Sequence, residues 1–163
     1  PRGATQTSPP DTKARCVALS TGDCSSRAGL AACAASMASS DKPTLPTVQV
    51  LVGKYSVKAE LADTNQSRQT GLMNRAYLPS NNGMLFVFDR SETQCMWMKN
   101  TLIDLDVAFA DESGRILNVE QMKSGTTDIH CSRGNSKLAL EMNRNWFLER
   151  SLGTGDSIEI IKQ

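Results

Sequence analysis

The sequence predicts a mainly β domain with minor α content, a small antiparallel β-barrel or sandwich-like fold with one or two short helices. Short segments with alternating or continuous apolar residues recur at close spacing through residues 48–161, and turn-forming residues separate them. Only two segments have helical features, and both are brief. We therefore expect one core built mostly from strands.

The first half of this domain is expected to contain a hairpin, a short helix and a buried strand. A Gly-Lys turn divides two apolar runs, which predicts a hairpin over residues 48–62. Asp63 and Gln66 have the spacing of a capping box, so a short helix is expected from there to about Arg75. Residues 84–88 are uniformly apolar, which favours a strand covered on both faces.

The second half is expected to begin with a hairpin over residues 103–121. Its strands alternate apolar and polar residues on either side of the turn sequence Asp-Glu-Ser-Gly. The remaining elements expected are a polar loop over 123–136, a strand over 137–142, a helical turn over 146–150 and a strand over 157–161.

Residues 1–47 are expected to form a disordered leader or linker, and residues 48–163 the domain. Ala, Ser, Thr, Pro and Gly dominate the first segment, which lacks a hydrophobic period. Leu-Ala-Ala-Cys at residues 30–33 resembles a bacterial lipoprotein cleavage site, but the apolar run that should precede Cys33 is interrupted. The leader is therefore either a signal remnant or a vector-derived segment, and lipidation of Cys33 stays open. No segment approaches the roughly 18 apolar residues of a transmembrane helix.

The charge balance argues against a nucleic-acid-binding protein. The chain has 18 Lys/Arg and 17 Asp/Glu, of which residues 1–47 hold five and three, so the remainder has a net charge of −1. A nucleic-acid interface requires a basic face. We also expect no metal and no cofactor, because there is one histidine and no Cys-x-x-Cys, and methionine is chiefly a core residue.

Several linked motifs resemble the DUF192 (UPF0127) family over residues 48–161. They are Arg68-x-x-Gly71-Leu72-Met73-x-Arg75, Gly83-Met84-Leu85-Phe86-Val87-Phe88, Trp97-Met98-Lys99-Asn100-Thr101, Leu105-Asp106, Leu140-Glu141 with Trp146-Phe147, and Gly155-Asp156. The resemblance implies a compact β-rich fold and a bacterial or archaeal protein that is often secreted or membrane-anchored, but no reaction. Asp104, Met96 and Asn74 depart from the family pattern.

The resemblance also bears on location and on the cysteines. It implies a periplasmic or secreted protein, with lipid anchoring as an open alternative. Export favours a disulfide between Cys95 and Cys131, which would tie the 123–136 loop to the central strand. Two unpaired buried thiols are the alternative.

The predicted site centres on residues 97–101, where three polar side chains follow an apolar run. As a strand, this segment would place Trp97, Lys99 and Thr101 on one face. Trp97 would serve as a stacking platform beside hydrogen-bonding groups, as in sites for small polar ligands. The predicted ligand-binding residues are Arg75, Trp97, Asn100, Thr101, Asp106 and Glu141. In the alternative interpretation, Trp97 belongs to the core and Asn100 and Thr101 satisfy a backbone bend.

Three functions follow from these residues. We prefer a noncatalytic cell-envelope module whose partner is a small polar ligand such as a saccharide. The second is a hydrolase using Asp104, Asp106 or Glu141, since paired carboxyls can act as general acid and base. Arg75 beside Asp106 or Glu141 is either part of such a constellation or a structural salt bridge. The third is a module that binds an envelope protein. The sequence identifies neither a catalytic residue nor an oligomeric state.

Overall fold

The computed structural model describes residues 44–161, and the expectations for the leader over residues 1–43, including Cys33, lie outside them. The described residues form nine strands and two short helices. In chain order they are β1 (Thr47–Val52), β2 (Tyr55–Ala62), α1 (Asn65–Thr70), β3 (Asn82–Glu92), β4 (Cys95–Met96), β5 (Leu105–Ala110), β6 (Ile116–Met122), β7 (His130–Cys131), β8 (Ser136–Asn143), α2 (Trp146–Glu149) and β9 (Ile158–Ile161).

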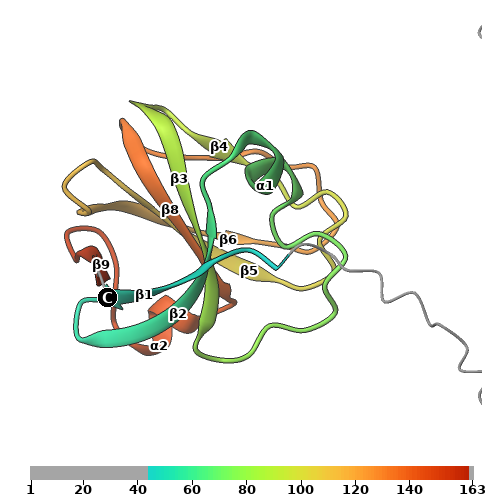
Figure 1. The fold of residues 1–163 in the computed structure, drawn as a ribbon, viewed down its shortest axis with the longest axis horizontal. Coiled ribbons are helices and arrows are strands. Elements are labelled where there is room, and N and C mark those ends of the chain that lie inside the picture. Colours follow the sequence, from blue (N-terminus) through green and yellow to red (C-terminus); the bar gives the residue numbers. More distant parts are fainter. Residues whose placement is uncertain (1–43, 162–163) are drawn as a thin grey trace, which may run out of the picture. The chain divides into compact units, whose positions relative to one another are not determined.

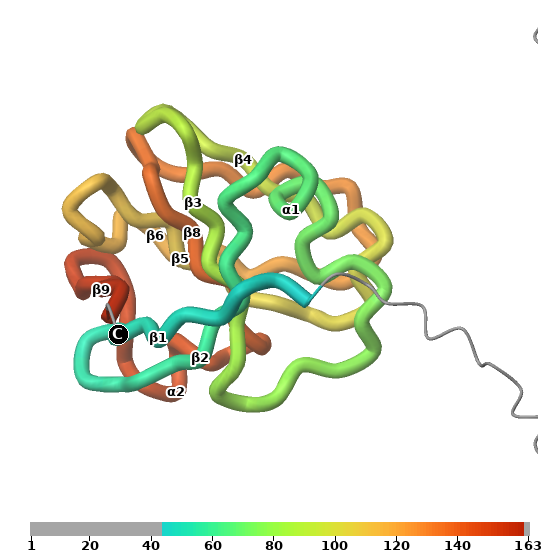
Figure 2. The backbone as a smooth tube through the Cα atoms, viewed as in Figure 1, coloured from blue at the N-terminus to red at the C-terminus, as the bar shows by residue number. Residues whose placement is uncertain are grey.

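Seven of the strands form one curled sheet in the order β6-β5-β8-β3-β2-β1-β9, and β4 pairs with β7 in a separate two-stranded sheet (Figure 1). The predicted mainly β class with two short helices is confirmed. One pairing in the large sheet is parallel, that of β2 with β3. Parallel neighbours need a crossover connection, and the chain makes it through α1 and the loop that follows (Figure 2).

The hairpin of β5 and β6 shows how local sequence determines this fold. The Asp111 carboxylate accepts hydrogen bonds from the backbone N–H groups of Ser113 (2.9 Å) and Arg115 (3.1 Å), which closes the turn. Gly114 has a φ of 85°, and a Cβ atom there would lie 2.3 Å from the carbonyl oxygen of Ile158. Only glycine fits this position, so the turn sequence is a reliable signal and the predicted hairpin is present.

The helix α1 differs from the expected one at both ends. Its N-cap is Thr64, whose hydroxyl accepts from the Ser67 N–H (3.1 Å) while the Ser67 hydroxyl accepts from the Thr64 N–H (3.0 Å). The capping box expected at Asp63 and Gln66 is therefore wrong by one residue. The helix ends at Thr70 rather than near Arg75, because Gly71 follows with a φ of 47°, outside the helical range.

The two faces of the large sheet carry separate apolar clusters. Leu85 of β3 and Leu140 of β8 are paired and belong to one cluster, while the next pair, Phe86 and Ala139, belongs to the other. This alternation follows from the period of two in a strand. The expectation that the strand over residues 84–88 is covered on both faces holds for residues 84–86, which are buried. The face of the Phe86 cluster is the one that borders the candidate site.

Candidate functional site

A cavity of about 320 Å³ lies where α1 and the residues after it meet β3, β4 and β8. Three of the six predicted ligand-binding residues line it, namely Trp97, Thr101 and Glu141. Two further aromatic side chains, Phe86 and Phe88, form part of its wall. Sequence reasoning missed both phenylalanines because their uniformly apolar run is the usual signature of a buried strand.

Residues 97–101 form a turn and not the expected strand. The Thr101 N–H donates to the Met98 carbonyl (3.0 Å), and Asn100 has a φ of 58° at the third position, as in a type II turn. Met98 is fully buried, whereas Trp97 is 49% exposed. The interpretation of Trp97 as a core residue is therefore wrong. Asn100 is exposed and does not line the cavity.

Glu141 is a buried acid without a protein partner. Its residue is 5% exposed, and it lies in β8 between Met84 of β3 and Val107 of β5. No hydrogen bond or ion pair to its carboxyl group exists among residues 44–161. Burial raises the pKa of Glu141 to about 8, because the charged form is poorly solvated there. At neutral pH the group is therefore mostly an uncharged carboxylic acid.

The hydroxyl of Thr101 is in a similar position. Thr101 is buried, and its backbone N–H and carbonyl bond to Met98 and Gly125 respectively. Within the described part of the chain its hydroxyl has no hydrogen-bond partner. Thr101 and Glu141 thus bring two unpartnered polar side chains to one cavity.

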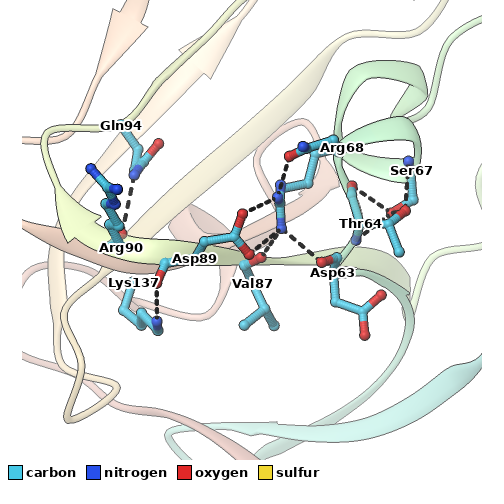
Figure 3. A network of polar contacts seen from close by, with 10 residues as sticks. Asp63, Thr64, Ser67, Arg68, Val87, Asp89, Arg90, Gln94 and Lys137 are labelled. Carbon is cyan, nitrogen blue, oxygen red and sulfur yellow. Dashed lines mark hydrogen bonds and ion pairs between the residues drawn. The ribbon is translucent and has the colours of Figure 1, made fainter.

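Arg68 fixes the helix that forms one wall of the cavity. Its guanidinium donates to the carbonyl oxygens of Asp63 (2.8 Å) and Val87 (2.7 Å), as Figure 3 shows. It also donates to Asn65 Oδ1 (2.6 Å) and pairs with Asp89 Oδ2 (2.7 Å). These bonds tie α1 to β3. Arg68 therefore has a structural role, and most of its N–H groups already donate hydrogen bonds within the protein.

We expect Arg68→Met to lower the free energy of unfolding by about 2 kcal/mol, because two backbone carbonyls lose a charged donor. Asp89→Asn should cost less than about 1 kcal/mol, since the Asp89 side chain is mostly exposed and exposed ion pairs contribute little. Urea unfolding of both variants measures the difference. Equal losses would show that the ion pair, and not the carbonyl contacts, holds α1 in place.

Arg75 contacts neither of the carboxyl groups considered for it in the sequence. Both of its terminal nitrogens bond to the Glu60 carboxylate, with Nη2 lying 2.6 Å from Oε2. This bidentate ion pair raises the pKa of Arg75, mainly because the Glu60 carboxylate accepts hydrogen bonds from its guanidinium. It joins the segment after α1 to β2. The geometry matches the structural salt bridge rather than a constellation with Asp106 or Glu141.

Asp106 and Glu141 lie on opposite faces of the sheet. Asp106 is paired with Met142, and the adjacent pair is Val107 with Glu141, so alternation directs the two acids to different sides. Asp106 is buried, and burial raises its pKa to about 6, although the Asn145 N–H bonds to it. It does not line the cavity around Glu141.

Asp104 is engaged immediately before the start of β5. Its carboxylate accepts from the Ser124 N–H (2.8 Å) and pairs with Arg144 (2.9 Å), contacts that lower its pKa, the Ser124 bonds most. Paired hydrolytic carboxyls must face one cleft. Glu141 lies on the opposite face of the sheet from Asp106, and neither Asp104 nor Asp106 lines the cavity around Glu141.

The predicted disulfide between Cys95 and Cys131 is present and joins β4 to β7. Cys95 also contributes to the wall of the cavity. Over residues 44–161, no cluster of three or more His, Cys, Asp or Glu side chains is placed to hold a metal ion. In the same range, neither helix is long and apolar enough to cross a membrane.

The chain belongs to the DUF192 family, described as "Uncharacterized ACR", whose model matches residues 48–160. Among proteins with curated descriptions, none matches the sequence. Two solved structures are similar to this chain, each with 28% sequence identity. One is a proposed transcription regulator from Sinorhizobium meliloti 1021, with a TM-score of 0.70, covering 72% of this chain and 95% of that one. The other is a protein of unknown function from Novosphingobium aromaticivorans DSM 12444, with a TM-score of 0.69, covering 71% of this chain and 86% of that one.

Proposed function

We propose that this DUF192 domain is a noncatalytic module that binds a small polar ligand in the cavity lined by Trp97, Thr101 and Glu141. The observation that carries the proposal is the pair of unpartnered polar groups, the Thr101 hydroxyl and the Glu141 carboxyl. Among residues 44–161, the one fully buried side-chain oxygen without a hydrogen bond is Asp106 Oδ1, so the oxygens of Thr101 and Glu141 are accessible from the cavity. A ligand in the cavity could bond to both, and one such bond contributes about 0.5–1.5 kcal/mol.

The apolar part of the cavity fits the same role. Trp97 presents half of its surface to solvent, and Phe86 and Phe88 stand in the same wall. Aromatic surface beside a few polar groups is typical of sites for small polar ligands, saccharides included. The volume of about 320 Å³ is near the lower end of the range for ligand pockets. A compact ligand is therefore favoured.

We propose an extracytoplasmic location for the domain, which suits a role in the cell envelope. The Cys95–Cys131 disulfide is compatible with an oxidising compartment, because cytosolic thiols are normally kept reduced. A role in transcription, which the description of the Sinorhizobium protein raises, is less favoured: residues 48–163 have a net charge of −1, and DNA interfaces are strongly positive. The hydrolase alternative is less favoured at this cavity, because Glu141 is the one carboxyl residue in its described wall.

Tryptophan fluorescence tests the proposal. In a Trp146→Phe background, Trp97 is the only tryptophan left in the chain and reports on the cavity. We expect a saturable change with at least one member of a panel of mono- and disaccharides, amino acids and short peptides. Thr101→Val should weaken that binding about tenfold, as expected for the loss of one buried hydrogen bond.

The matched control is Thr154→Val. The Thr154 hydroxyl donates to the Leu117 carbonyl (3.1 Å), and the residue does not line the cavity. Its removal should leave the affinity unchanged. Binding in this cavity would be refuted if no ligand of the panel changed the Trp97 fluorescence. It would also be refuted if Thr101→Val and Thr154→Val lowered the affinity equally.

A further inference from the structure

The charges around the cavity point to a particular class of ligand. Arg68 and Glu141 are the ionisable side chains in the described wall. Arg68 already has a counter-ion in Asp89, 2.7 Å away. Glu141 has none within residues 44–161. A positive charge beside Glu141 would stabilise its ionised form, which no group in the described wall does.

The aromatic wall favours the same charge. Phe86, Phe88 and Trp97 line the cavity, and the faces of aromatic rings attract cations, most strongly where water is excluded. The ammonium nitrogen of Lys99 lies 5.5 Å from the centroid of the Trp97 ring, so a bound cation would share this ring with Lys99 and would rely more on Phe86 and Phe88. An organic cation has both the charge for Glu141 and the surface for these rings.

We infer that the ligand is a small organic ammonium ion, held by the Glu141 carboxylate as its counter-ion and by the aromatic rings of Phe86, Phe88 and Trp97. This inference rests on the proposed function and narrows its ligand from small polar molecules to cations. The cavity size of about 320 Å³ suits a compact ammonium compound.

Binding of such an ion is coupled to release of one proton. In the free protein burial keeps Glu141 protonated, with a pKa of about 8, while the bound ammonium ion stabilises the carboxylate. The carboxyl O–H bond breaks, its electron pair stays on the carboxylate, and the proton leaves to solvent. Affinity for a permanently charged ammonium ion should therefore increase about 100-fold from pH 6 to pH 9.

Asp89, Arg90 and Glu92 of β3 line a neighbouring pocket that shares Arg68, Phe88 and Gln94 with this cavity. The neighbours of Glu141 on β3 and β5 are Met84 and Val107, which are uncharged. From α1 the charged neighbour of the cavity is Arg68, which is paired with Asp89. Two charged or ionisable residues lie next to lining residues: His130 is paired with Met96 across β4 and β7, and Lys99 lies over Trp97. His130→Gln therefore serves as the matched control for Glu141→Gln.

The experiment measures binding of tetramethylammonium and choline to the Trp146→Phe protein by fluorescence and calorimetry at pH 6, 7.5 and 9. The neutral isostere of choline, 3,3-dimethyl-1-butanol, is the matched control ligand. We expect choline to bind, to gain about 100-fold in affinity across this range, and to release close to one proton at pH 6, read from two buffers with different ionisation enthalpies. The neutral isostere should bind more weakly than choline, and its affinity should not increase from pH 6 to pH 9.

Two variants complete the test. Glu141→Gln should abolish both the pH dependence and the proton release, whereas His130→Gln should preserve them. The inference is overturned if choline and its isostere bind equally, or if the pH dependence survives in Glu141→Gln. It also fails if both cations leave Trp97 unaffected while a neutral ligand of the first panel binds, in which case the proposed function stands. If no ligand of either panel binds, both proposals fail.

Discussion

Replacing Glu141 by glutamine is expected to stabilise the ligand-free domain by about 4 kcal/mol more at pH 9 than at pH 5. Burial raises the pKa of Glu141 from 4.5 to about 8. Between these two values the folded state binds more protons than the unfolded state. The stability of the natural protein therefore falls as pH rises through this window, and it is fully retained only below about pH 4.5. Glutamine has no proton to lose, so the variant escapes this decline.

Urea unfolding at pH 5, 7 and 9 measures the effect. Asp106→Asn is the matched control, because Asp106 is also a buried carboxyl on the same sheet but its pKa is raised only to about 6. The gain in unfolding free energy of Asp106→Asn over the natural protein should reach nearly its full value by pH 7. The corresponding gain of Glu141→Gln should continue to increase up to pH 9. Parallel stability curves for Glu141→Gln and the natural protein would show that Glu141 is charged in the folded state at neutral pH.

Removal of the disulfide is expected to cost about 4 kcal/mol. Cys95 and Cys131 are 36 residues apart, and cross-linking a loop of this length restricts the unfolded chain by about that amount. The bond also holds β4 against β7 beside the cavity. We therefore expect Cys95→Ser/Cys131→Ser to unfold at a clearly lower urea concentration than the oxidised protein.

Reduction provides the control for this experiment. Dithiothreitol should lower the unfolding midpoint of the natural protein to about that of the double variant, and it should leave the double variant unchanged. A variant with Cys16, Cys24 and Cys33 replaced by serine should behave like the natural protein. If reduction does not move the midpoint of the natural protein, the disulfide does not contribute to stability.

The strand pattern was predictable because it depends on local signals. Alternation of apolar residues and the turn chemistry of Asp111 and Gly114 act over a few residues, so they are visible in the sequence. The start of α1 was misplaced because Asp63 and Thr64 are both good N-cap residues. Thr64 caps the helix with Ser67, whose side chain is buried, and that burial depends on tertiary packing.

The candidate site was predictable in part. Residue type alone points to Trp97, Thr101 and Glu141, and the fold brings them to one cavity. Residue type points equally to Asp106, yet a single step along β5 directs it to the other face of the sheet. Which face of a sheet carries a cavity depends on the elements packed over it, and no local pattern encodes this.

Arg75 illustrates the same limit for a charged side chain. Its partner Glu60 is 15 residues away on β2, and the pair depends on how the segment after α1 returns to the sheet. Asp106 and Glu141 were equally reasonable partners by residue type. Pairing between elements is decided by the crossover, which the sequence pattern predicts only as a helix and a loop.

The central claim is that the cavity on the Glu141 face of the sheet binds a ligand. Its most direct test is to titrate Trp97 fluorescence with the best ligand of the panels in Glu141→Gln and Asp106→Asn, both in the Trp146→Phe background. The two variants make the same carboxyl-to-amide change on opposite faces of one sheet. We predict that Glu141→Gln changes the affinity at least tenfold and that Asp106→Asn leaves it unaltered. An unaltered affinity in Glu141→Gln would contradict the claim.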